Sequence, residues 1–134
     1  MEMTTVHVPY GRQVLDVSVP AANLQAVLAP KQQAEPGDEG MLLAEALSQP
    51  IGCPRLRDLA RPGQKVVIVT SDLTRPCPSD LLLPPVLEEL AEAGVADGDI
   101  TIVMALGLHR PMTEGEMEQA VGSEVYSRFR LLNH

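Results

Sequence analysis

The segment from Ser71 to Ser79 brings together side chains that can bind an anion. It carries hydroxyls, the carboxylate of Asp72 and the guanidinium of Arg75. Ser71 and Thr74 offer hydroxyl donors, and Arg75 can hold a phosphate or a carboxylate through two parallel hydrogen bonds. Asp72 could accept from a ribose or orient Arg75. A structural alternative stays open, in which Asp72 and Arg75 pair with each other in an ordinary helix start.

A second polar segment, Gly107 to Pro111, contains a candidate for proton transfer. His109 suits that role because an imidazole titrates near neutral pH and can take and return a proton. The neighbouring Arg110 would favour the neutral, basic form of the ring. Histidines are often structural or simply exposed, however, and we assign His7 and His134 to that class.

Each polar segment directly follows an apolar run that predicts a strand. Residues 66–70 read VVIVT, and residues 100–106 read ITIVMAL. Continuous β-branched runs are typical of strands that are covered on both faces in a parallel sheet. Between them, residues 79–94 show apolar side chains at helical spacing, with Ser79 or Asp80 as the expected N-cap.

Residues 65–106 therefore form a predicted β-α-β unit. Its crossover is expected to be right-handed, so both strands end at the same edge of the sheet. Open α/β sheets bind ligands at that edge. We therefore expect Arg75 and His109 to face one common cleft.

The amino-terminal region predicts a hairpin and a loop. Residues 4–9 and 14–19 are alternating and β-branched, and the segment from Tyr10 to Gln13 separates them as a turn. The stretch from Ala29 to Gly40 carries prolines and glycines without periodic apolar residues, so we expect a surface loop there.

Three further elements are expected around the β-α-β unit. Residues 41–49 predict a helix with Asp38 or Glu39 as its N-cap. Thr113 predicts the N-cap of another helix, because a glutamate follows three residues later. Residues 128–134 resemble an additional strand.

Together these patterns predict an α/β fold. We expect a Rossmann-like, three-layer domain with a mostly parallel sheet and an amino-terminal β-hairpin. At 134 residues the chain has the size of one ordinary domain. Residues 1–134 are therefore expected to share one core, with no linker between domains.

The composition argues against several classes of protein. Ten Lys and Arg against eighteen Asp and Glu give a net charge of −8, which repels phosphate backbones and disfavours a nucleic-acid partner. No apolar run predicts a signal peptide or a membrane span, so we expect a cytoplasmic protein without a membrane partner. The motifs of kinases, dehydrogenases and serine hydrolases are missing. Cys53 and Cys77 lack the spacing of a zinc or redox site and are expected to be reduced thiols.

Taken together, the two polar segments resemble the amino-terminal domain of the lactate racemase family. The resemblance rests on Ser71 to Pro76 (SDLTRP) after a predicted buried strand, and on Ala105 to Thr113 (ALGLHRPMT). It covers residues 10 to 134 and is strongest from 65 to 118. It implies part of an isomerase that racemises or epimerises a small 2-hydroxy acid.

The resemblance also implies a cofactor and a partner domain. In that family a nickel ion, held by the nickel-pincer nucleotide, accepts a hydride from C2 of the substrate and returns it to either face. Two histidines, one for each face, move the hydroxyl proton. The nickel-ligating histidine, the cofactor-tethering lysine and the second catalytic histidine belong to a carboxyl-terminal domain of the same protein. We therefore expect no metal ligand in this chain, no activity by itself, and an exposed apolar surface where the second domain packs.

Site residues are carried over by the same resemblance. His109 matches the catalytic histidine of the amino-terminal domain. Arg75 and Arg110 are expected to contact the substrate. The residues expected to contact the cofactor are Ser71, Asp72, Thr74 and Arg75.

A second hypothesis comes from another class of protein. The chain would then be a free-standing module that binds a phosphorylated or nucleotide ligand through the loop from Asp72 to Arg75, without catalysis.

Overall fold

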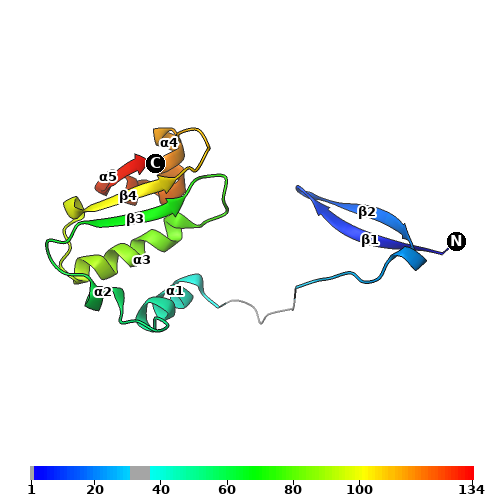
Figure 1. The fold of residues 1–134 in the computed structure, drawn as a ribbon, viewed down its shortest axis with the longest axis horizontal. Helices are drawn as coiled ribbons and strands as arrows, with labels where there is room; N and C mark the ends of the chain where they lie inside the picture. The colour runs from blue at the N-terminus through cyan, green and yellow to red at the C-terminus, as the bar shows by residue number, and fades with distance from the viewer. Residues whose placement is uncertain (1, 31–36) are drawn as a thin grey trace. The chain divides into compact units, whose positions relative to one another are not determined.

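The computed structural model describes residues 2–30 and 37–134, and the chain divides into two compact units, Met1–Pro36 and Gly37–His134 (Figure 1). The hairpin is thus a unit of its own, whereas the length of the chain suggested one continuous core. The predicted surface loop from Ala29 to Gly40 lies partly outside the described residues.

The first unit is the expected antiparallel hairpin. Strand β1 (Met3–Tyr10) pairs with β2 (Gln13–Pro20), with Tyr10 opposite Gln13. Gly11 takes a φ of 59° in the turn, a conformation that glycine adopts without strain. A short 3-10 helix, η1 (Ala21–Asn23), follows. None of the described residues of this hairpin is fully buried, so its two strands do not enclose a core.

The second unit contains a three-stranded parallel sheet in the order β3-β4-β5. The strands are β3 (Val66–Ser71), β4 (Ile100–Ala105) and β5 (Arg130–Asn133). Ser71 pairs with Ala105, so β3 and β4 end at the same edge, as the β-α-β pattern predicted. The predicted last strand is confirmed but starts later, because helix α5 (Ser123–Arg128) occupies the residues before it.

Helix α3 (Ser79–Glu92) connects the first two strands of this sheet. Its expected side-chain cap is wrong: the N-cap is Pro78, and the hydroxyl of the buried Ser79 lies 2.6 Å from that of Thr70 instead. The helix is followed by Gly94, whose φ is 83° and whose missing Cβ would lie 2.9 Å from Cγ of Pro62. Glycine is required there for both reasons.

Other helices follow their sequence signals more closely. Asp38 caps α1 (Glu39–Ser48) by accepting from the Met41 N–H at 3.0 Å. Thr113 caps α4 (Glu114–Val121) in a complete capping box. The short α2 (Leu56–Leu59) and the 3-10 helix η2 (Asp97–Asp99) were not predicted.

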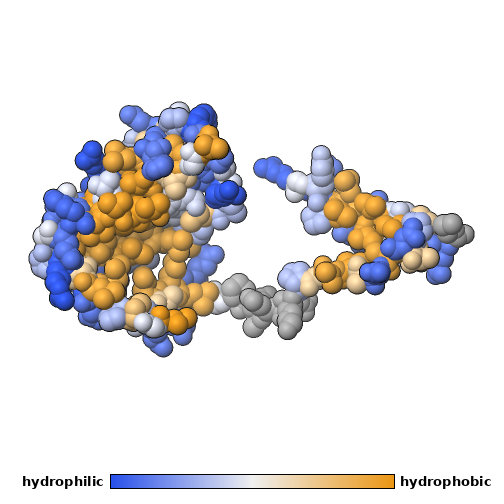
Figure 2. Space-filling view, viewed as in Figure 1, coloured by the Kyte–Doolittle hydropathy of each residue, from blue (hydrophilic) through white to orange (hydrophobic). Residues whose placement is uncertain are grey.

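The two faces of the sheet differ in what covers them. Helices α3, α4 and α5 contact one another and pack on the face that carries Ile102 and Met104, which are fully buried. On the opposite face Val67 and Val69 of β3 are 62% and 66% exposed. Figure 2 shows the resulting apolar surface over the sheet of the larger unit. The α/β class, the parallel sheet and the hairpin are confirmed. The expected coverage of β3 on both faces is wrong for the described residues, because none of their elements covers Val67 and Val69.

Candidate functional site

The two polar segments meet at the carboxyl edge of the sheet, because β3 and β4 are neighbours in register. The contact is made by Asp72, directly after β3, and His109, in the turn after β4. Nδ1 of His109 forms a hydrogen bond with Oδ2 of Asp72. Residues far apart in the sequence therefore form one polar cluster at the edge where such sheets bind ligands.

Asp72 is the buried centre of this cluster. It is 4% exposed, and its Oδ1 accepts from the Thr74 N–H at 3.1 Å and from the Thr74 hydroxyl at 2.7 Å. The Arg75 N–H donates to the Asp72 carbonyl at 3.2 Å, which closes the loop. The pKa of Asp72 is lowered, first by the hydrogen bond from the Thr74 side chain and next by that from His109, against the opposing effect of burial. The carboxylate is thus held in its charged form.

His109 is held at one nitrogen and open at the other. Its side chain is 47% exposed. The backbone N–H of His109 donates to the Leu106 carbonyl at 3.0 Å. Gly107 turns the chain there with a φ of 59°. Nδ1 also lies 3.4 Å from the Thr74 hydroxyl, whereas Nε2 has no hydrogen-bond partner among residues 2–30 and 37–134. That nitrogen is the one available to a ligand.

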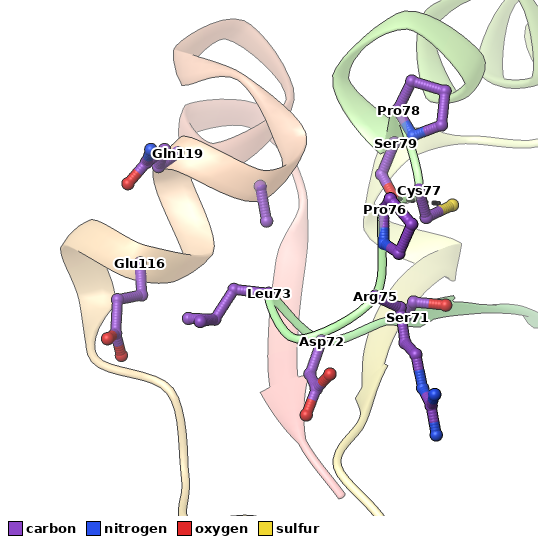
Figure 3. Close-up of a pocket in the computed structure, with 11 residues that line it drawn as sticks. Ser71, Asp72, Leu73, Arg75, Pro76, Cys77, Pro78, Ser79, Glu116 and Gln119 are labelled. Atoms are coloured by element: carbon purple, nitrogen blue, oxygen red, sulfur yellow. Dashed lines mark hydrogen bonds between the residues drawn. The ribbon is translucent and has the colours of Figure 1, made fainter. Parts of the chain in front are cut away.

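Arg75 does not pair with Asp72, so the structural alternative for these two residues is not realised. Within the described ranges its guanidinium forms no ion pair. It lines a cleft of about 620 Å³ between the loop after β3 and helix α4, together with Ser71, Asp72 and residues of α4 such as Gln119. In Figure 3 the Asp72 and Arg75 side chains extend to the same side of the loop, and Leu73 points toward Glu116.

His109 lies outside that cleft, in a smaller hollow of about 70 Å³ that Asp72, Leu73 and Thr74 also line. Asp72 and Leu73 border both spaces. Arg75 and His109 therefore occupy the same sheet edge in two adjoining hollows, and not the one common cleft that the sequence suggested.

Arg110 lines the same hollow as His109 and is paired with Glu116. Its two terminal nitrogens donate to the Glu116 carboxylate at 2.8 and 2.7 Å. This pairing lowers the pKa of Glu116 to about 2 and raises that of Arg110. The charge of Arg110 is thus compensated by Glu116 of α4, and its expected influence on His109 and contact with the substrate stay predictions. The capping-box pattern located Glu116 but did not predict that its carboxylate pairs with Arg110.

The start of α3 offers fewer donors than a helix N-terminus usually does. The Ser79 N–H donates to the Cys77 carbonyl at 2.8 Å, and the Leu81 N–H donates to the Pro78 carbonyl at 3.1 Å. The donors that this edge offers to an anion are therefore side chains, chiefly Arg75 and the hydroxyl of Ser71, which line the cleft. Sequence patterns also missed Gln119, since nothing local marks a helix residue that faces a cleft.

Two further properties concern the described residues as a whole. No group of three or more His, Cys, Asp or Glu in the described ranges is arranged to hold a metal ion. None of the helices described here is both long and apolar enough to cross a membrane.

The family comparison and the similar known proteins point to the same family. Residues 10–134 match the family described as lactate racemase N-terminal domain. The chain is 33% identical to the lactate racemase of Thermoanaerobacterium thermosaccharolyticum and 28% identical to that of Lactiplantibacillus plantarum, over 98% of its own length in each case. It spans 31% of the length of each relative.

A solved structure gives the same result. The lactate racemase apoprotein of T. thermosaccharolyticum superposes with a TM-score of 0.79 at 33% identity, covering 98% of this chain and 30% of that one.

Proposed function

The chain belongs to the lactate racemase N-terminal domain family, and on that premise we propose that it is the amino-terminal part of an isomerase that racemises or epimerises a small 2-hydroxy acid. The observation that carries the proposal is the contact between Asp72 and His109 at the ligand-binding edge of the sheet, with Arg75 unpaired beside it.

His109 has the chemistry that the reaction needs. Inverting C2 of a 2-hydroxy acid requires the C2–H bond to break. When Nε2 takes the hydroxyl proton, the oxygen electrons can form the carbonyl of a 2-keto acid as the hydrogen leaves C2 as a hydride. Return of the hydride to the opposite face, with a proton returned to the oxygen, completes the inversion.

The nickel-pincer nucleotide, when bound, would supply the hydride acceptor. The residues of this chain fit its phosphate in part. Arg75 and Ser71 have side-chain donors without partners in the described ranges, next to a cleft of adequate size. Thr74 already donates its hydroxyl hydrogen to Asp72, and the Asp72 carboxylate would repel a phosphate. We therefore assign phosphate or carboxylate binding to Arg75 and Ser71, and remove Asp72 and Thr74 from the direct contacts.

The remaining part of the racemase is proposed as the partner. The relatives carry about two thirds of their length beyond the matched region, and this chain presents an exposed apolar sheet face with Val67 and Val69. Exposed contiguous apolar surface marks an interaction site. We infer that the rest of the racemase covers this face and supplies the metal ligands, so the 134-residue chain alone is inactive.

The test is D/L interconversion by the complete racemase. The protein would be produced together with the enzymes that make the cofactor, and a panel of 2-hydroxy acids would be supplied as single enantiomers. His109→Ala is expected to lower kcat by about 10²- to 10⁴-fold, the usual contribution of a general base. His7→Ala, in the hairpin, is the matched control. Full activity of His109→Ala would remove that residue from the mechanism.

A free-standing anion-binding module remains the second candidate, because the unpaired Arg75 guanidinium needs no catalysis to hold a phosphate. Calorimetry of the 134-residue chain with a nucleoside monophosphate distinguishes the two. Arg75-dependent binding, combined with no isomerase activity in the complete protein, would favour the module.

A further inference from the structure

We propose that Asp72 is a positioning residue, whose carboxylate fixes the proton of the neutral His109 ring on Nδ1 and so leaves Nε2 as the basic nitrogen. The inference rests on the proposed role of His109 as the proton carrier. It gives Asp72 a function toward the histidine, in place of one toward the cofactor or a ribose.

The hydrogen bonds at Asp72 decide the direction of the His109 bond. A carboxylate can only accept, so the hydrogen between Asp72 and His109 must come from Nδ1. A neutral imidazole carries one proton, and a hydrogen bond at one ring nitrogen decides the state of the other nitrogen. With the proton on Nδ1, the Nε2 lone pair is the one exposed at the sheet edge.

Thr74 fixes the orientation of the carboxylate. Its N–H and its hydroxyl both donate to Oδ1 of Asp72, so that oxygen is saturated by the loop and Oδ2 is directed at His109. Asp72 is buried, and it keeps this geometry on a loop that its own carbonyl closes through the Arg75 N–H. The charged carboxylate also compensates the positive charge that the ring acquires when Nε2 takes a proton.

This arrangement makes Asp72→Asn a directed test. The two Thr74 donors require an acceptor, so the amide oxygen of the asparagine must face Thr74 and its NH₂ group must face His109. An NH₂ group donates, which forces Nδ1 to accept and moves the ring proton to Nε2. The shape of the loop is preserved while the basic nitrogen is turned away from the ligand edge.

The decisive measurement is ¹⁵N NMR of the histidine rings in the 134-residue chain at about pH 9, where histidine is ordinarily neutral. Assignment uses His109→Gln, and the dispersion of the backbone amide signals reports whether each variant is folded. We expect the Nδ1–H form in the wild type and the Nε2–H form in Asp72→Asn. Thr74→Val, which keeps the carboxylate, should retain the Nδ1–H form. An Nε2–H ring in the wild type, or an unchanged ring in a folded Asp72→Asn, overturns the inference.

Activity of the complete racemase gives a separate readout. Asp72→Asn should lower kcat by about 10²- to 10⁴-fold with little change in KM. Combined with His109→Ala it should cost little more than His109→Ala alone, because the two residues act as one unit. Additive losses in the double variant would contradict a role through His109. If no variant, wild type included, racemises a 2-hydroxy acid, the proposed function fails while the NMR result still decides the role of Asp72.

Discussion

Asn133, in β5, forms two hydrogen bonds with the backbone of Met112, just after the turn that carries His109. Its Oδ1 accepts from the Met112 N–H at 3.0 Å, and its Nδ2 donates to the Met112 carbonyl at 2.9 Å. Met112 is buried, so neither backbone group can turn to water without local unfolding. The last strand of the described chain therefore anchors the segment that positions the candidate base.

Replacing Asn133 with Asp should destabilise the chain. The variant keeps an acceptor for the Met112 N–H but places a carboxylate oxygen against the Met112 carbonyl, so a largely buried acceptor loses its donor. We expect the free energy of unfolding to fall by about 1–3 kcal/mol, measured by urea denaturation. His134→Ala, at the exposed neighbouring position, should leave it nearly unchanged. Equal stability of Asn133→Asp and the wild type would show that the two hydrogen bonds between Asn133 and Met112 do not stabilise the fold.

A second anchor joins α2 to α3. Glu89 is 3% exposed and accepts from Arg55 at 2.6 Å and from Nε of Arg57 at 2.8 Å. These bonds, those from Arg57 first, lower the pKa of Glu89 to about 2. A buried carboxylate that serves two guanidinium groups is costly to remove, because Arg55 would lose its acceptor and Arg57 would keep only its ion pair with Glu92.

Glu89→Gln should therefore lower the free energy of unfolding by about 1–3 kcal/mol, the usual cost of weakening hydrogen bonds to a buried charged group. Glu88→Gln is the matched control, since Glu88 is the preceding residue and is exposed. Guanidinium chloride would screen the interaction, so urea is the suitable denaturant. A loss as small as that of Glu88→Gln would mean that solvent and Glu92 already satisfy the two arginines.

Stability should also depend on pH through the same carboxylates. The folded-state pKa values of Glu89 and Glu116 are about 2, below the ordinary 4.5, and that of Asp72 is lowered too. A lowered folded pKa gives stability that is fully present above the unfolded pKa and is lost as pH falls through the folded value. The chain should thus lose stability as pH falls from about 4.5 to about 2. Urea midpoints measured across that range check it, and Glu89→Gln should show a weaker dependence than the wild type.

The sequence predicted the elements with strong local signals and missed those that depend on distant partners. The β-branched runs located β3 and β4, and Thr113 located α4, because their signals lie within a few residues. Helices α2 and α5 are too short to show a helical period. Ser79 does not cap α3, because its hydroxyl is engaged by Thr70 on the preceding strand.

The candidate site shows the same division. The sequence brought Asp72 and His109 to one edge, because parallel strands in a right-handed β-α-β unit end together. The sequence left two partners open for Asp72, namely Arg75 and a ligand. In the structure the carboxylate of Asp72 forms its hydrogen bond with His109 instead. The choice depends on the register of Ser71 with Ala105, which no local pattern encodes. The pairing of Arg110 with Glu116 likewise depends on how the turn folds back on α4.

The exposed sheet face gives the last prediction. Val67→Thr combined with Val69→Thr keeps the β-branched shape that strands favour. It replaces one methyl group of each exposed valine with a hydroxyl. The free energy of unfolding of the 134-residue chain should change by no more than about 0.5 kcal/mol per site. Its affinity for the rest of the racemase, produced as a separate polypeptide, should fall about fourfold or more per valine, because a hydroxyl replaces a methyl group whose burial is worth about 0.8 kcal/mol.

Ile102→Val is the control for this pair of substitutions. Ile102 is fully buried under the helices on the opposite face, so the change should cost about 0.5–1.5 kcal/mol of stability and leave the affinity of the folded chain unaltered. Calorimetric titration of each folded variant separates the two effects. If the double threonine variant binds as tightly as the wild type, the partner packs elsewhere, and the apolar surface over β3 has a different origin.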